Sequence, residues 1–167
     1  MTKYINYGVY KEYLDLLVER LRKQLEAEEI LACALFGSVA RGQAGLDSDI
    51  DLLVVTKSIE ADTTINFVRL HKELKREAPT LALNKKGIFP EPYPIFLSAA
   101  QLQDNALILL DIADHGISLY DTGILERRLD QLRCRLRKLD ARKVTHADGS
   151  WHWDLKPDWR PGEVIEL

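Results

Sequence analysis

Two aspartates separated by one residue, Asp49 and Asp51, have the types and spacing that most directly suggest chemistry. Ile50 and the leucines and valines after Asp51 predict a β-strand. Alternate side chains of a strand share a face, so both carboxylates are expected to point the same way. Two like charges side by side repel, and a divalent cation between them would remove that conflict. Because oxygen ligands suit a hard cation such as Mg²⁺, we predict that Asp49 and Asp51 are metal ligands and catalytic residues.

A Gly-Ser pair closes an earlier apolar run, residues 30–36, which predicts a buried strand. Gly37 permits a tight turn, and Ser38 begins a short helical turn whose backbone N–H groups can bind phosphate oxygens. Arg41 would add positive charge there; the alternative is a surface arginine paired with Asp47. Ser48 is expected to support the turn before the aspartates. The two strands would thus bring an anion-binding turn and a carboxylate pair together.

The order and spacing of these residues resemble a known family signature. Gly37-Ser38, the Ala40-Arg41-Gly42 that follows, and the stretch from Ser48 to Leu52 are similar to the motif of the minimal nucleotidyltransferases, members of the DNA polymerase β-like superfamily. The resemblance covers roughly residues 30–120.

The resemblance implies an α/β (α+β) fold, a small mixed β-sheet flanked by helices. It implies an enzyme that transfers a nucleoside monophosphate from a nucleoside triphosphate, with ATP the first candidate, to a hydroxyl. Two Mg²⁺ ions would be held by Asp49 and Asp51. Gly37, Ser38, Arg41 and Ser48 would contact the nucleotide. Proteins of the antitoxin type in this family are often paired with a helical toxin, so a partner protein is also implied.

The chain departs from the family pattern at its third carboxylate, which relatives carry on the neighbouring strand. Residues 93–98, the predicted third strand, contain no Asp or Glu. Glu91 lies just before this strand and Asp104 after it, and Ser98 is a weaker ligand. An alternative function is therefore a nucleotide-binding module that is catalytically weak or inactive and acts by binding a partner.

Hydrophobic periodicity predicts the elements that position these residues. Helices are expected at residues 9–28, 63–77 (closed by Pro79), 99–104, 105–115 and 125–139, and a short strand at residues 117–121. The prolines near residue 93 are expected at the start of the third strand, where they cost no ladder bond.

The C-terminal part, residues 123–167, is predicted to be an appendage to a nucleotidyltransferase domain formed by residues 1–122. Its helix has a basic face, which we interpret as solvated, with a nucleic-acid or acidic-partner contact as the alternative. The basic residues are Arg127, Arg128, Arg133, Arg135, Arg137 and Lys138. A hairpin is expected around Asp148-Gly149. Three tryptophans in this C-terminal part, Trp151, Trp153 and Trp159, are expected to pack it onto the domain, with partner binding or base stacking as the alternative.

Net charge, cysteine content and the length of apolar runs argue against several classes of protein. The net charge of −3 argues against a protein that coats nucleic acid through global charge, although a local contact stays open. Cys33 and Cys134 have no paired spacing and no secretory leader precedes them, which favours a reducing cytoplasm. No apolar run is long enough to predict a membrane span. Whether the protein forms oligomers is left open.

Overall fold

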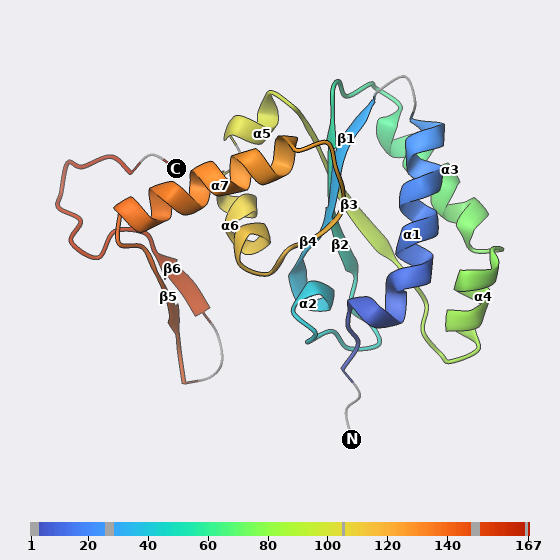
Figure 1. Ribbon diagram of the computed structural model, residues 1–167. Coiled ribbons are helices and arrows are strands. Elements are labelled where there is room, and N and C mark those ends of the chain that lie inside the picture. The colour runs from blue at the N-terminus through green and yellow to red at the C-terminus, as the bar shows by residue number, and fades with distance from the viewer. Residues whose placement is uncertain (1–3, 26–28, 105, 148–150, 166) are drawn as a thin grey trace.

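A four-stranded mixed sheet with strand order β3-β2-β1-β4 lies at the centre of the structure (Figure 1). The computed structural model describes residues 4–25, 29–104, 106–147, 151–165 and 167. The strands are β1 (Ile30–Leu35), β2 (Ile50–Thr56), β3 (Pro92–Ser98) and β4 (Ile117–Asp121). β1 pairs antiparallel with both β2 and β4, whereas β2 and β3 are parallel. The predicted mixed sheet flanked by helices is confirmed.

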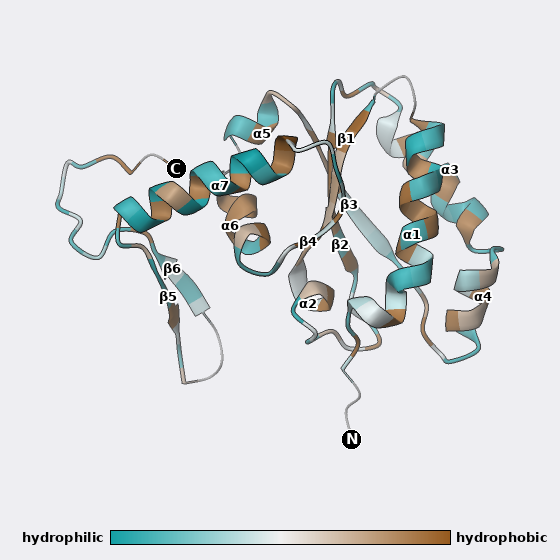
Figure 2. Cartoon of the chain, viewed as in Figure 1, coloured by the Kyte–Doolittle hydropathy of each residue, from teal (hydrophilic) through white to brown (hydrophobic). Residues whose placement is uncertain are grey.

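Helices cover both faces of the sheet, as Figure 1 shows. One face packs against α1 (Tyr7–Gln24), α3 (Thr63–Leu74) and α4 (Ala78–Asn84). The other face packs against α5 (Gln101–Asp104), α6 (Ala106–His115) and α7 (Ile124–Lys138). The short helix α2 (Gly37–Ala40) follows β1 directly. In Figure 2 the central strands β1 and β2 are hydrophobic, as strands buried on both faces must be.

Alternation along β2 decides which face each side chain reaches. Leu52 and Val54 belong to the core under α1, and Leu53 and Val55 belong to the core under α6 and α7. Asp51 has the parity of the second set, so it lies on the α6 side of the sheet.

Several predicted boundaries differ from the structure. The first helix runs over Tyr7–Gln24, and the predicted residues 26–28 lie outside the described residues, as does Asn105 between α5 and α6. Pro79 does not simply close α3: α3 ends at Leu74, and Pro79 lies in the first turn of α4, where its missing N–H costs nothing.

Pro92 begins β3, as predicted, whereas Pro94 lies inside the strand. Pro92 and Pro94 are part of the strand that pairs with β2, and β3 is an edge strand. An edge strand tolerates proline because only one of its two sides is hydrogen-bonded to a neighbour.

The C-terminal helix α7 contributes a buried leucine face to the core on the α6 side, formed by Leu125, Leu129, Leu132 and Leu136. Its opposite face is largely exposed, but Arg128 was wrongly placed there. Arg128 is 3% exposed, and its guanidinium donates to the carbonyls of Leu102 and Gln103. The division of the chain at residue 122 stays a prediction.

A two-stranded hairpin, β5 (Arg142–Thr145) and β6 (Trp151–Asp154), follows α7. The predicted turn at Asp148-Gly149 lies outside the described residues. Trp153 packs against the core under α7, and the Lys143 ammonium lies over the Trp151 ring. Trp159 is 49% exposed, so the prediction that all three tryptophans pack the hairpin onto the domain was wrong for this one.

No helix among the described residues is long and apolar enough to cross a membrane.

Candidate nucleotide and metal site

The end of β1 and the start of β2 lie at the same end of the sheet because the two strands are antiparallel, and this pairing brings the Gly-Ser turn close to Asp51. The Phe36 N–H donates to the Asp51 carbonyl at 3.0 Å, which ties the two strands together at this point. Gly37 then takes a left-handed conformation with φ +70°, and α2 begins. Glycine is the residue that adopts this conformation without steric cost. The predicted proximity of the turn to a carboxylate is therefore confirmed for Asp51.

Gly37 is also required by the close approach of Asp51. A Cβ atom at residue 37 would lie 2.0 Å from Asp51 Oδ2, far inside van der Waals contact. The missing side chain lets the carboxylate lie directly against the backbone of the turn. This contact fixes one of the two predicted metal ligands beside the predicted phosphate-binding residues.

The two aspartates differ in environment. Asp49 is exposed in the connection just before β2, and Asp51 is half-buried at the second position of the strand. Burial raises the pKa of Asp51, the nearby Asp49 and Asp111 carboxylates raise it further, and Arg41 lowers it in part. The site therefore carries more negative charge than Arg41 neutralises.

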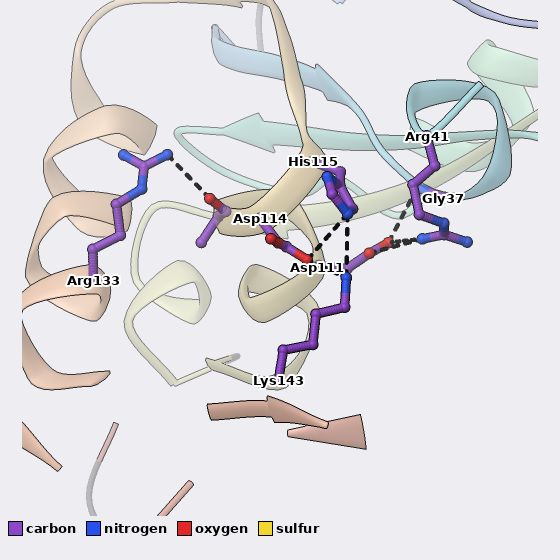
Figure 3. A network of polar contacts seen from close by, with 8 residues as sticks. Gly37, Arg41, Asp111, Asp114, His115, Arg133 and Lys143 are labelled. Carbon is purple, nitrogen blue, oxygen red and sulfur yellow. Dashed lines mark hydrogen bonds and ion pairs between the residues drawn. The ribbon is translucent and has the colours of Figure 1, made fainter. Parts of the chain in front are cut away.

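Asp111 is a carboxylate of this site that sequence reasoning missed. It comes from α6, and its Oδ2 accepts the Gly37 N–H at 3.2 Å (Figure 3). Arg41 Nη1 lies 2.8 Å from Asp111 Oδ1 and 2.9 Å from Oδ2. The alternative pairing of Arg41 with Asp47 was wrong. One sequence signal for Asp111 existed, because it is the acidic residue within the otherwise apolar residues 106–113.

The two serines of the motif have different surroundings. Ser48 Oγ accepts the Gly45 N–H at 2.9 Å, which is the predicted support of the turn before Asp49. Ser38 is half-buried at the second position of α2, next to Gly37. A direct contact of either serine with a nucleotide stays a prediction.

Neither acidic residue considered as a third carboxylate lies on β3 beside Asp51. Glu91 pairs with His71 of α3 and with Lys75 directly after it, both at 3.2 Å, on the opposite face of the sheet. Asp104 is exposed at the end of α5, where its charge acts on Arg128.

The register explains what stands in the place of a third carboxylate. Tyr93 is the partner of Asp51 and Ile95 the partner of Leu53, so both β3 side chains share the face of Asp51. Within the described part of the chain, no group of three or more His, Cys, Asp or Glu side chains comes together as a metal-binding cluster. Mg²⁺ is commonly held by one or two carboxylates together with substrate phosphates and water, and Asp49 with Asp51 fits that donor set.

A glycine turn that lies against a carboxylate at one end of a mixed sheet is the arrangement expected from the resemblance to the nucleotidyltransferases. The family model described as Polymerase beta, Nucleotidyltransferase matches residues 19–122. The chain belongs to this nucleotidyltransferase family.

Comparison with curated proteins finds no significant match. Among solved structures, a crystal structure of a toxin-antitoxin with AMP-PNP is 16% identical, with 75% of this chain and 89% of that chain covered and a TM-score of 0.47. A structure from Shewanella oneidensis is 15% identical, with 77% and 87% covered and a TM-score of 0.44. A complex of tri-AMPylated Shewanella oneidensis HEPN toxin with MNT antitoxin is 15% identical, with 76% and 92% covered and a TM-score of 0.39. These similarities are distant, and the family assignment rests on the family model.

Proposed function

We propose that the protein transfers a nucleoside monophosphate from a nucleoside triphosphate, with ATP the first candidate, to a hydroxyl acceptor. The observation that carries this proposal is the contact between Asp51 and the backbone of Gly37, because it joins a metal-ligating carboxylate to a phosphate-binding turn in a chain of the nucleotidyltransferase family. Phosphoryl transfer depends chiefly on positioning and on neutralising charge, which are the functions these groups can supply.

Each residue has a role in this proposal. Asp49 and Asp51 hold Mg²⁺, and when bound the metal neutralises the triphosphate and lowers the pKa of the attacking hydroxyl. The Gly37 N–H and the Ser38 hydroxyl bind phosphate oxygens, and Arg41 adds positive charge beside them. Burial and then the neighbouring Asp49 and Asp111 carboxylates raise the pKa of Asp51, and this gathering of negative charge is the physical reason to expect a divalent cation here.

Transfer can be tested with the purified protein, Mg²⁺ and each of the four α-labelled ribonucleoside triphosphates, with and without cell extract. We expect label to move from one nucleotide to an acceptor. The Asp49→Asn/Asp51→Asn variant should lose transfer and bind the Mg²⁺-nucleotide at least about tenfold more weakly, since charged contacts of this kind contribute roughly 1.5–3 kcal/mol each.

The control is Asp47→Asn, which removes one negative charge, where the double variant removes two, from an exposed position of the same connection. It should retain both binding and transfer. Nucleotide binding that survives in the double variant would contradict the assignment of Asp49 and Asp51.

A second candidate function is a nucleotide-binding module that transfers little or nothing. The observation that favours it is the pair Tyr93 and Ile95 on the face of β3 where relatives are expected to carry a carboxylate. Nucleotide binding by the wild type without label on any acceptor, including the protein encoded by a neighbouring gene, is the result that this function predicts.

A partner protein is proposed from the resemblance to antitoxin-type nucleotidyltransferases. If the acceptor is such a partner, the label in the transfer experiment will migrate with a protein and not with a small molecule or a nucleic acid.

A further inference from the structure

A carboxylate of the chain itself occupies two donors of the proposed phosphate-binding turn. Asp111 accepts the Gly37 N–H and contacts Arg41 Nη1 through both oxygens (Figure 3). Backbone N–H groups and guanidinium groups are the donors with which proteins bind phosphate. We infer that Asp111 is an internal anion that competes with the triphosphate for these donors and thereby limits the affinity for nucleotide. This inference rests on the proposed function.

The negative charges around Asp111 favour displacement of its carboxylate by a phosphate group. Its carboxylate is one of three acidic groups near the turn: Asp51 lies against Gly37, and Asp49 comes two residues before Asp51 in the chain. Repulsion from these neighbours opposes the position of Asp111, and Arg41 compensates for part of it. A triphosphate binds together with Mg²⁺, which neutralises part of its negative charge. The Asp111 carboxylate has no such accompanying cation.

The contact of Arg41 with Asp111 uses one guanidinium nitrogen. Both short distances start from Nη1, while Nε is buried and has no hydrogen-bond partner within the described residues. The stronger arrangement between an arginine and a carboxylate is two parallel hydrogen bonds from two nitrogens. The observed pair is therefore not the tightest that these groups can form, and exchange of Asp111 for a phosphate is expected to cost little.

Helix α6 is held in place independently of this contact. Leu109 and Ile112, on either side of Asp111, are buried in the core, and Asp114 pairs with Lys143 of the hairpin one turn later. A change of the Asp111 side chain is therefore sufficient to free the Gly37 N–H and Arg41, without movement of the helix. Asp114 supplies a matched position for a control, since the side chains are 20% exposed at Asp111 and 25% exposed at Asp114.

The test compares wild type, Asp111→Asn and Asp114→Asn by calorimetric titration with inorganic tripolyphosphate without metal and with ATP and Mg²⁺. We expect Asp111→Asn to bind tripolyphosphate about tenfold more tightly, the size of one charge-assisted hydrogen bond. Asp114→Asn should stay within about twofold of the wild type. Thermal unfolding of Asp111→Asn should occur at a lower temperature, because the ion pair with Arg41 is lost.

The opposite signs of these two effects separate competition from structural support. A residue that only stabilises the turn would lower both the unfolding temperature and the affinity when replaced. Equal or weaker binding by Asp111→Asn, with a wild type that binds, overturns this inference and leaves the proposed function intact. Absence of binding in every protein overturns the proposed function itself. If Asp111→Asn does not fold, Asp111→Ser is measured in its place.

Discussion

At Gly37 two independent requirements fall on one residue. The backbone is left-handed, and the space of a side chain is occupied by the Asp51 carboxylate. A left-handed conformation alone costs roughly 1–2 kcal/mol for a residue with a Cβ atom. Forcing an extra group into a filled space typically costs a further 1–3 kcal/mol, about the same again.

We therefore expect Gly37→Ala to lower the free energy of unfolding by about 2–5 kcal/mol and to displace Asp51. Gly87→Ala is the matched control, because Gly87 has φ +75° but no atom within 4 Å of its added Cβ. It should cost only about 1–2 kcal/mol. Chemical denaturation of both variants measures the difference, and equal costs would show that the approach of Asp51 to Gly37 is not a steric constraint.

A second residue-scale prediction concerns the cost of ionising Asp51. Burial and the neighbouring carboxylates raise its pKa in the folded state, so the folded protein binds this proton more tightly than the unfolded chain does. The ionised carboxylate therefore lowers stability at neutral pH, and this penalty disappears as the pH falls below about 4, the ordinary range of an aspartate.

Asp51→Asn should accordingly raise the unfolding temperature at pH 7, with a gain that shrinks to nothing as the pH is lowered through that range. Thermal scans between neutral and acid pH measure it, and Asp47→Asn corrects for the general loss of one negative charge. A variant that is less stable than the wild type at neutral pH would disprove the unfavourable environment inferred for Asp51.

The sequence predicts the site residues that lie close together in the chain, but not those that only the packing of helices brings to the site. Gly37, Asp49 and Asp51 could be predicted because turns and strands are local structures. The spacing of residues within a short stretch of sequence is enough to indicate them. Asp111 is 74 residues from Gly37, and its partners follow only from how α6 packs on the sheet. An aspartate in an apolar helix signals that some partner exists but does not say which one. The same reason explains why the Arg41 partner was misassigned.

Among the elements, α7 connects the C-terminal part of the chain with the core of the sheet. Leu132 is fully buried, and it packs in one cluster with residues of β1, β2 and α6. Replacing a buried leucine with alanine usually costs about 2–5 kcal/mol.

Leu132→Ala should therefore destabilise the whole protein by about that amount in a single unfolding transition. Leu107→Ala, at a position of α6 that is 76% exposed, should change the free energy of unfolding by less than about 0.5 kcal/mol. Two separate transitions in the Leu132→Ala variant would instead indicate that α7 and the hairpin unfold independently, as an appendage would.

Element boundaries were harder to predict than element types. The strands β1, β2 and β4 follow from short apolar runs, and α7 follows from its leucine spacing. The helix α4 was missed because its seven residues are too few to show a periodic pattern, and its proline was interpreted as the end of the preceding helix. Pro94 was expected at the start of β3 but lies inside it, since nothing in the sequence alone says that this strand lies at an edge.

At the scale of the whole molecule, the sheet separates two hydrophobic cores, and the candidate site lies on the same side of the sheet as the core that contains α6. The pair Asp51 and Asp111 lies on the α6 side, while Glu91 faces α3 across the sheet. This separation explains why Glu91, just before β3, does not join the site, whereas Asp111 of α6 does. The hairpin is tied to the same side through Lys143 and Asp114 (Figure 3).

The outer edge of β3 has a consequence for how copies of this protein meet at high concentration. The Ala99 N–H points inward to Thr56, so by alternation residues 92, 94, 96 and 98 direct their backbone nitrogens outward. Two of these residues are prolines without a donor, and the Ser98 N–H is taken by the side chain of Gln101. An aggregating strand needs a row of such donors to dock. The prolines beside the candidate site thus also protect this edge against amyloid-like growth.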